Sequence, residues 1–485
     1  MVKSNGGIIG PDNVTTGGFS GVASGVFKLG EVTDLIKQNK WPEVSPFINT
    51  IPNSVRLDGG GTYFSRTQTA GNRRTWTQSG WYKFDGIDPG NAQSLVSTNG
   101  TNTGTNFHYT LEKGGSSGGA SDTLSCHGYS GDIFQTTRLL RDYSGWYHIV
   151  LAVDTTQGTS ANRMKLYVNG ESVTMSEQAQ YPAQNFEFGV NNNGIVLGLG
   201  THPGSVSGYQ FSGYMANIEL VDGLAYGPEY FGSTNADSGI WTPVPTSTIS
   251  SYGTNGFKLA FANASALGTD TSGQSNNFTA NSITSIDQST DSPSNNFSTL
   301  NPLNVNPANT NTFSEGNLKA VLNGEGTTST MAMASGNWYM EYKCSGNITQ
   351  WTGVEEINSL ISLQYSSATK SVALYVGGAT MYVNGANQGS GGYGSGWSSG
   401  DIGMIAFDAD NARVYFGKNG GWWNGSSYGA SSPSTYVAAT TGKTYYFRFV
   451  KGGNTTCDYE VNFGGTQSFA ISSGNADANG FGNFE

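Results

Sequence analysis

The sequence predicts an all-β protein with two β-sandwiches in tandem, which follow a short N-terminal segment containing one helix. Short apolar stretches recur along the 485 residues and are separated by clusters of glycine, asparagine and serine, as is typical of sandwiches and barrels. The chain contains 70 glycines, and only 12% of its residues are charged, compared with ~25% in ordinary domains. Its 12% of aromatic residues can still fill a core, which a disordered chain could not do.

The N-terminal segment contains the only helical pattern that we assign. Residues 25–42 (GVFKLGEVTDLIKQNKWP) place Val32, Leu35 and Ile36 on one helical face, and Pro42 ends the segment. We therefore expect one short helix within residues 25–42.

The same segment resembles a known kind of leader. Residues 7–14 (GIIGPDNV) and the stretch that follows resemble the start of structural proteins from tailed bacteriophages, notably those that infect marine bacteria. The resemblance implies that residues 1–52 attach the chain to a virion. The alternative is that the helix only packs on the first sandwich. The candidate attachment residues are Val32, Leu35, Ile36 and Trp41.

The first sandwich is marked most clearly by two strands and the turn after them. Residues 146–153 form an almost unbroken apolar and aromatic run, which at this length favours a central strand. Residues 164–168 then alternate between apolar and other side chains, which predicts a strand with one buried face. Asn169 and Gly170 provide the positive φ values of a tight hairpin turn.

These strands resemble the laminin-G and concanavalin A-like superfamily. The resemblance rests on residues 145–150 (GWYHIV) and 167–170 (YVNG), and residues 211–232 resemble the closing strand and exit turn of phage versions of that fold. It implies a jelly-roll sandwich over residues 53–232. The superfamily includes lectins, glucanases, adhesion modules and inert structural domains, so the resemblance leaves the function open.

Residues 233–312 are predicted to connect the two sandwiches and to add strands to the first. Residues 253–265 (GTNGFKLAFANAS) contain a strand pattern, and residues 270–279 resemble a loop that commonly accompanies laminin-G-like strands. Residues 291–304 (DSPSNNFSTLNPLN) contain two prolines, which keep the backbone extended, so we place the domain boundary there.

The second sandwich is predicted over residues 313–485. Its clearest part is residues 400–425, where an apolar strand runs into Asp408-Ala-Asp410-Asn411 and continues as a second alternating strand. This pattern resembles a SPRY-type sandwich, which is also a concanavalin A-like jelly roll. In that pattern the two aspartates form a hairpin turn. We therefore expect no metal there, and no cofactor elsewhere.

The composition argues against several classes of function. A net charge of −11 supplies no basic stripe for nucleic acid, and no apolar run is long enough to insert in a membrane. No secretion signal is visible at the amino end, so we expect synthesis in a host cytoplasm. The three cysteines are odd in number and far apart, which favours buried free thiols.

No catalytic pattern is visible, so we expect a protein that is not an enzyme. A concanavalin A-like glucanase would need two carboxylates at i and i+4 on one strand with an aspartate between them, and the sequence has no E-x-D-x-E motif or near variant. The pair Glu355-Glu356 would point to opposite faces of a strand, and we interpret it as a solvated loop. His148 lies in a predicted central strand and is expected to be a hydrogen-bonded interior residue.

Aromatic residues among glycines suggest where a ligand could bind. Tyr393, Trp397, Trp422 and Trp423 stand in glycine-rich stretches, and aromatic faces on polar loops stack well on sugar rings. We therefore predict that these four residues bind carbohydrate. The alternative is that one aromatic residue of each pair belongs to the core.

Taken together, the resemblances imply a non-enzymatic virion structural protein of a bacteriophage: an outward-projecting tail fibre or knob that contacts host surface glycans. Its expected partners are other virion proteins and further copies of itself, most often in a trimer. A capsid-surface decoration protein is the close alternative. A glycan-degrading enzyme and a bacterial adhesin are the alternatives from other classes.

Overall fold

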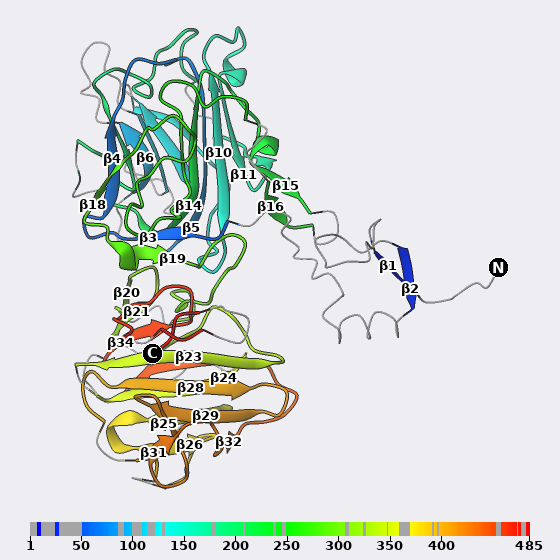
Figure 1. Ribbon diagram of the computed structural model, residues 1–485, viewed down its shortest axis with the longest axis vertical. Coiled ribbons are helices and arrows are strands. Elements are labelled where there is room, and N and C mark those ends of the chain that lie inside the picture. Colours follow the sequence, from blue (N-terminus) through cyan, green and yellow to red (C-terminus); the bar gives the residue numbers. More distant parts are fainter. Residues whose placement is uncertain are drawn as a thin grey trace, which may run out of the picture.

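The computed structural model describes two β-sandwiches, one above the other along the long axis of the molecule (Figure 1). Before residue 51 it describes only the antiparallel strands β1 (Gly7–Gly10) and β2 (Gly25–Lys28). From residue 51 to 485 it describes the chain except for residues 86–91, 99–108, 114–121, 129–130, 176–180, 205, 207–208, 236–238, 245–248, 306–309, 324–325, 347, 358–368, 390–391, 395–396, 453–456, 473 and 477–481.

The start of the segment predicted to be helical forms a strand instead. Gly25–Lys28 pairs with Gly7–Gly10, because its valine and phenylalanine are better suited to a strand than to a helix terminus. The remaining predicted helical positions lie outside the described residues, as do the four candidate attachment residues Val32, Leu35, Ile36 and Trp41. Within the part that the structure describes, no helix is long and apolar enough to cross a membrane.

The first sandwich consists of two antiparallel sheets. The eight-stranded sheet has the order β12 (Glu171–Ser172), β11 (Met164–Val168), β10 (Tyr147–Asp154), β5 (Thr75–Phe84), β14 (Ser212–Asp222), β3 (Ser54–Asp58) and β19 (Gln288–Ser289), with β17 (Phe257–Leu259) also paired to β14. The seven-stranded sheet has the order β18 (Thr279–Asn281), β4 (Tyr63–Thr67), β13 (Val196–Leu199), β6 (Gln93–Thr98), β7 (Tyr109–Lys113), β8 (Leu124–Gly128) and β9 (Gly131–Gln135). A small hairpin, β15 (Gly232–Thr234) and β16 (Trp241–Pro243), follows β14.

The second sandwich repeats the arrangement. Its nine-stranded sheet has the order β20 (Thr312–Ser314), β21 (Lys319–Leu322), β34 (Cys457–Asn462), β23 (Asn337–Ser345), β28 (Ile402–Asp408), β29 (Arg413–Lys418), β30 (Gly421–Trp423) and β31 (Tyr428–Ala430), with β32 (Val437–Ala438) beside β29. Its six-stranded sheet has the order β22 (Gly326–Thr328), β33 (Tyr445–Lys451), β24 (Gln350–Glu356), β25 (Ser371–Tyr375), β26 (Thr380–Val383) and β27 (Ala386–Asn387). Short 3₁₀ turns lie at Ser160–Asn162, Pro228–Tyr230, Ser285–Asp287 and Val376–Gly378.

The central strand and hairpin predicted from the sequence are confirmed. Strand β10 lies between β5 and β11, and its residues Ile149, Leu151 and Val153 enter the core of the first sandwich. Asn169 and Gly170 adopt φ values of 51° and 79°, which are the left-handed conformations that this tight hairpin requires. Each sandwich has its own large apolar core, as two jelly rolls in tandem should.

The connecting region adds strands to the first sandwich, as predicted: β17, β18 and β19 all join its sheets. The end of this region is fixed by a buried lysine. Lys83 Nζ donates to Asp291 Oδ2 at 2.7 Å, to Asn296 Oδ1 at 2.8 Å and to the Phe297 carbonyl at 2.8 Å. Trp146 Nε1 donates to the second carboxylate oxygen of Asp291 at 3.0 Å. The connector is therefore anchored to the first sandwich and is not a free linker.

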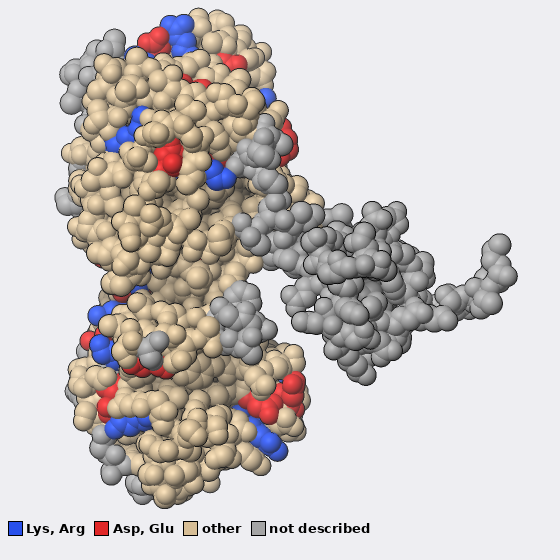
Figure 2. All heavy atoms as spheres, viewed as in Figure 1, with Lys and Arg blue, Asp and Glu red and all other residues tan. Residues whose placement is uncertain are grey.

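Other polar contacts join the two sandwiches directly. The guanidinium of Arg56 in β3 lies 3.2 Å from the Asp287 carboxylate and 3.0 Å from the Glu315 carboxylate at the start of the second sandwich. The hydroxyl of Tyr214 donates to the carbonyl of Gly316 at 3.2 Å. On the face in Figure 2, charged side chains are few and of mixed sign. The two sandwiches are thus joined at the junction by an ion pair and a hydrogen bond.

Candidate functional site

The three tryptophans predicted to bind carbohydrate are buried. Trp397, Trp422 and Trp423 expose only 5%, 9% and 5% of their surface, and Tyr393 is half-buried. The expectation of a polar loop is wrong for Trp422 and Trp423, because both lie in β30 between β29 and β31, whereas Trp397 lies outside the strands but is still buried. Gly420 (φ 80°) occupies the tight turn before this strand, so the glycine serves a fixed turn and not flexibility.

Three of these four side chains still lie together. The ring centroid of Trp423 is 5.4 Å from that of Tyr393 and 5.2 Å from that of Tyr428, and Trp397 packs edge-on against Tyr428 at 5.6 Å. Trp422 points the other way and lies 6.0 Å from Tyr339. Their role in carbohydrate binding stays a prediction, and their burial leaves little aromatic face for a sugar.

Glu355 is also buried, so the interpretation of Glu355-Glu356 as a solvated loop is wrong. Both residues belong to β24, and Glu355 Oε2 lies 2.5 Å from Nη1 of Arg448 on the neighbouring strand β33. Glu356 instead lies near two surface lysines, Lys370 and Lys443. The two carboxylates thus point to opposite faces, as the period of a strand requires. The burial of Glu355 depends on Arg448, whose position could not be seen in the local sequence.

His148 is an interior residue, as predicted. Its Nδ1 accepts a hydrogen bond from Trp241 Nε1 at 3.0 Å, and its Nε2 lies 2.9 Å from Ser79 Oγ. The ring stacks on Trp81 with the centroids 4.6 Å apart. Burial lowers the pKa of His148 to about 3, so the ring is neutral near neutral pH. With both nitrogens engaged, this histidine is structural.

The predicted hairpin at Asp408 is confirmed. Asn411 donates to the Asp408 carboxylate from its backbone amide at 3.0 Å and from its side-chain amide at 2.8 Å. Among the described residues, no group of three or more His, Cys, Asp or Glu side chains is placed to hold a metal ion.

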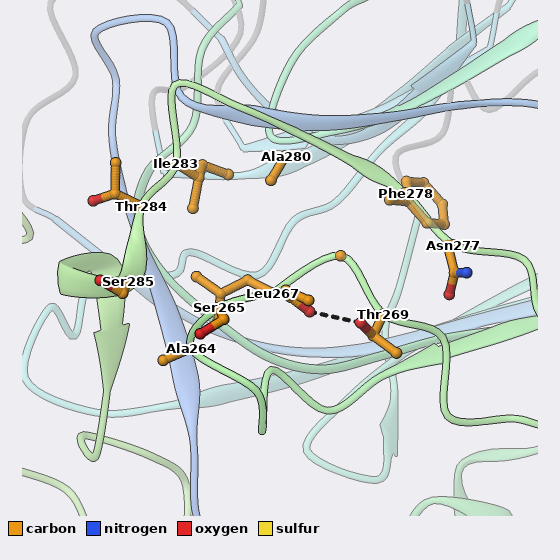
Figure 3. Close-up of a pocket in the computed structure, with 12 residues that line it drawn as sticks. Ala264, Ser265, Leu267, Thr269, Asn277, Phe278, Ala280, Ile283, Thr284 and Ser285 are labelled. Carbon is orange, nitrogen blue, oxygen red and sulfur yellow. Dashed lines mark hydrogen bonds between the residues drawn. The ribbon is translucent and has the colours of Figure 1, made fainter.

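Figure 3 shows one open pocket on the first sandwich, beside β18. It has a volume of about 560 Å³ and is lined by residues 264–269 and by residues between 277 and 285. Its one aromatic ring, Phe278, is buried, and the hydroxyl of Thr269 already donates to the carbonyl of Ala266 at 2.7 Å. Asn277 Oδ1 accepts from the backbone amide of Asp270. With these groups engaged and no charged side chain in its lining, this pocket offers a ligand few specific contacts.

A second hollow, of about 590 Å³, offers more and is here named the tyrosine groove. It lies on the outer face of β10 and β11, below the segment that follows β14. The alternation of β11 places Met164, Leu166 and Val168 in the core, which leaves Lys165 and Tyr167 on the outer face. The groove is lined by Ala152, Asp154, Gln157, Asn162, Lys165, Tyr167, Gly170, Ala225, Tyr226, Gly227, Pro228 and Glu229.

The two tyrosines of the groove are held in place from beneath. Tyr167 and Tyr226 pack against a small apolar cluster on the outer face of the sheet, which includes Val150 and Val221. Tyr226 also stacks on Tyr230 with ring centroids 4.0 Å apart. Because these rings are fixed before any ligand arrives, they can bind a flat apolar face without loss of side-chain freedom.

The polar side chains of the groove combine hydrogen-bond donors and acceptors. Burial works to raise the pKa of Asp154, but hydrogen bonds from Thr156 and Gln157 outweigh it and lower the pKa, so this carboxylate is ionised. Burial, and then the nearby charge of Glu229, raise the pKa of Tyr167, whose phenol therefore keeps its proton. Within the described residues, the ammonium group of Lys165 forms no ion pair.

Comparisons with known proteins agree with this fold. Residues 58–224 match the family model described as the concanavalin A-like lectin/glucanases superfamily, of the laminin-G type. The first sandwich is therefore a concanavalin A-like, laminin-G-like module. The matched stretch includes the groove residues from Ala152 to Gly170, whereas groove residues 225–229 lie just beyond its end. No curated protein matches the sequence.

Solved structures give only distant likenesses. The SPRY domain of human HERC1 is 15% identical, with 30% of this chain and 87% of that chain covered and a TM-score of 0.24. A pentraxin from Limulus polyphemus is 17% identical, with 37% of this chain and 79% of that chain covered and a TM-score of 0.27. A candidate carbohydrate-binding protein from Bacteroides ovatus is 17% identical, with 49% of this chain and 60% of that chain covered and a TM-score of 0.34. SPRY domains are among these distant likenesses, and nothing in the comparisons indicates a bacteriophage.

Proposed function

We propose that the protein binds carbohydrate without hydrolysing it, through the tyrosine groove of its first sandwich. The observation that carries the proposal is the pairing of two fixed tyrosine rings with polar groups that face the same hollow. A sugar offers an apolar ring face and a rim of hydroxyls, and the groove presents matching surfaces for both. The lectin/glucanase-type family match over the same module supports this ligand class.

The carboxylates of the groove favour binding over hydrolysis. A glycosidase needs a pair of carboxyl groups, one of which keeps a proton near neutral pH to serve as the acid. Asp154 and Glu229 both line the groove, but Asp154 cannot be that acid, because its pKa is lowered, and its oxygens already accept hydrogen bonds from Thr156 and Gln157. Prolonged incubation with assorted β-glucans should release no reducing ends. Hydrolysis that disappears in Glu229→Gln would refute the non-enzymatic role.

The finer proposal is that the chain is an appendage of a bacteriophage virion, made in the host cytoplasm and assembled from several copies. It is supported by the resemblance of residues 1–52 to phage leaders and by the anchored junction, which suits an outward-projecting rod. A capsid decoration protein is the alternative. Light scattering on the full chain should give a mass above 51.1 kDa, with a trimer favoured. A strict monomer at micromolar concentration would instead favour isolated decoration.

The experiment that tests binding itself is a glycan array probed with the full-length chain. We expect binding to a defined set of oligosaccharides with neutral rings. A chain that binds no glycan on a broad array would refute the proposal.

A further inference from the structure

A second pocket, here named the junction pocket, lies where the connector meets the second sandwich. It has a volume of about 400 Å³, within the range of small-ligand sites. The connector contributes Phe297, the start of β23 contributes Trp338 and Tyr339, and the end of the chain contributes Phe484. No charged residue is among those lining it. The pocket therefore brings together aromatic side chains from three distant parts of the sequence.

The aromatic walls are rigid. Trp338 Nε1 donates to the carbonyl of Ser335 at 2.8 Å, which fixes the indole. Tyr339 and Phe484 meet edge to face with ring centroids 4.8 Å apart. A Cβ at Gly465 would come within 2.8 Å of the Phe297 ring, so only glycine at this position allows the ring to pack there. A ligand would meet a surface that is already formed.

The connector side of the pocket is held by the first sandwich. The carbonyl of Phe297 accepts from Lys83, and Asn296 donates from its side-chain amide to the carbonyl of Ser144 at 2.8 Å. These contacts hold Phe297 from behind. The pocket is thus a product of the tandem arrangement, and it lies outside the stretch that matches the family model.

The rim adds polar groups that are open to a ligand. Asn295 and Asn337 are among the residues that line the pocket, and their side-chain amides make no hydrogen bond within the part of the chain that the structure describes. Each amide can both donate and accept. A purely apolar ligand would leave them unpaired, whereas a ring with hydroxyls would satisfy them.

We propose that the junction pocket is a second carbohydrate site, which takes one uncharged hexopyranose ring. The apolar face of the sugar stacks on the indole of Trp338, and its hydroxyls bond to Asn295 and Asn337. Because no cation lines the pocket, a uronic acid would place its carboxylate against aromatic rings without compensation and is disfavoured. The ligand class rests on the proposed carbohydrate-binding function, but the site is separate from the tyrosine groove.

Fluorine NMR on the full-length chain labelled with 5-fluorotryptophan tests the proposal. The probes are methyl β-D-glucopyranoside, methyl β-D-galactopyranoside and methyl α-D-mannopyranoside, with sodium D-glucuronate as the charged comparison. The Trp338 resonance is assigned by its absence in Trp338→Phe. We expect at least one neutral glycoside to shift this resonance saturably, and glucuronate to bind ~10-fold more weakly or not at all.

Two variants separate a binding role from a folding role. Asn337→Ala changes an exposed side chain and should weaken the glycoside by ~3–10-fold with an unchanged fluorine spectrum for the other tryptophans. Tyr167→Ala, in the groove, should leave the Trp338 shift intact. A Trp338 resonance that responds to none of the three glycosides, or a response unaffected by Asn337→Ala, would overturn the junction site while leaving the groove proposal standing.

Discussion

Replacement of Lys83 by methionine should destabilise the chain by ~3–5 kcal/mol, because it leaves a buried carboxylate without its cation. The side chains of Lys83 and Asp291 are only 1% and 2% exposed, and their charged atoms lie 2.7 Å apart. Methionine keeps the length of the side chain but removes all three hydrogen bonds that its ammonium group makes. The Asp291 carboxylate would then keep its hydrogen bonds from Trp146 and from the backbone of Phe297, but would have lost its cation.

Urea denaturation followed by near-ultraviolet circular dichroism measures the loss. The matched control is Lys165→Met, the same substitution at an exposed position of the same sandwich, which should change stability by no more than ~0.5 kcal/mol. Adding Asp291→Asn to Lys83→Met should restore part of the stability, because the uncompensated charge is then gone. A Lys83→Met variant as stable as Lys165→Met would refute the reasoning.

The pH dependence gives a second reading of the same pair. Burial raises the pKa of Asp291, and Lys83 counters that effect in the wild type. Without Lys83 the native state should hold a proton on Asp291 at a pH where the unfolded state does not, so stability rises as the pH falls. The difference in the free energy of unfolding between wild type and Lys83→Met should therefore become smaller as the pH is lowered from 8 to 5. A deficit that stays constant over this range would show that the charge is not its cause.

Three further predictions concern single residues. Trp422→Ala and Trp423→Ala should each lower the free energy of unfolding, measured by urea titration, by ~3–5 kcal/mol, because both side chains are buried. An unchanged urea midpoint for either variant would show that the tryptophan is exposed. Gly170→Ala should lower the melting temperature, because Gly170 has φ 79° and a Cβ there would lie 2.3 Å from the Trp241 ring; a melting temperature equal to that of wild type would contradict the hairpin geometry. The pKa of His148 is lowered from 6.5 to about 3 in the folded state, so the contribution of its neutral ring to the free energy of unfolding is complete above pH 6.5. This contribution, which is as much as ~5 kcal/mol, is lost as the pH falls toward 3. The stability difference between wild type and His148→Gln, measured at intervals across this range, should narrow on acidification and would stay flat if the imidazole were exposed.

The strands of the first sandwich could be predicted because their information is local. Residues 164–168 alternate strictly, and a strand with one buried face is the only regular structure that this period fits. The pair Asn169-Gly170 likewise specifies its own turn through backbone sterics. Period and turn chemistry are properties of a few adjacent residues, so one sequence is enough to show them.

The candidate sites could not be predicted in the same way. Glycines around Trp422 and Trp423 suggest flexibility when viewed in isolation, but Gly420 closes a turn whose strand is covered by β31. In the tyrosine groove, Lys165 and Tyr167 come from one hairpin, whereas Glu229 comes from a segment after β14. Which loop folds over which sheet depends on tertiary packing, and the local sequence pattern does not predict that packing.

The central claim is that the tyrosine groove binds sugar, and a calorimetric titration tests it most directly. The ligand is the oligosaccharide that gives the strongest signal on the glycan array, titrated into wild type, Tyr167→Ala and the control Tyr436→Ala, which removes an exposed tyrosine of the second sandwich. Loss of the Tyr167 ring should weaken binding by ~1–3 kcal/mol, about 5- to 150-fold, with Tyr436→Ala equal to wild type. Equal affinities for wild type and a folded Tyr167→Ala would show that the groove is not the binding site.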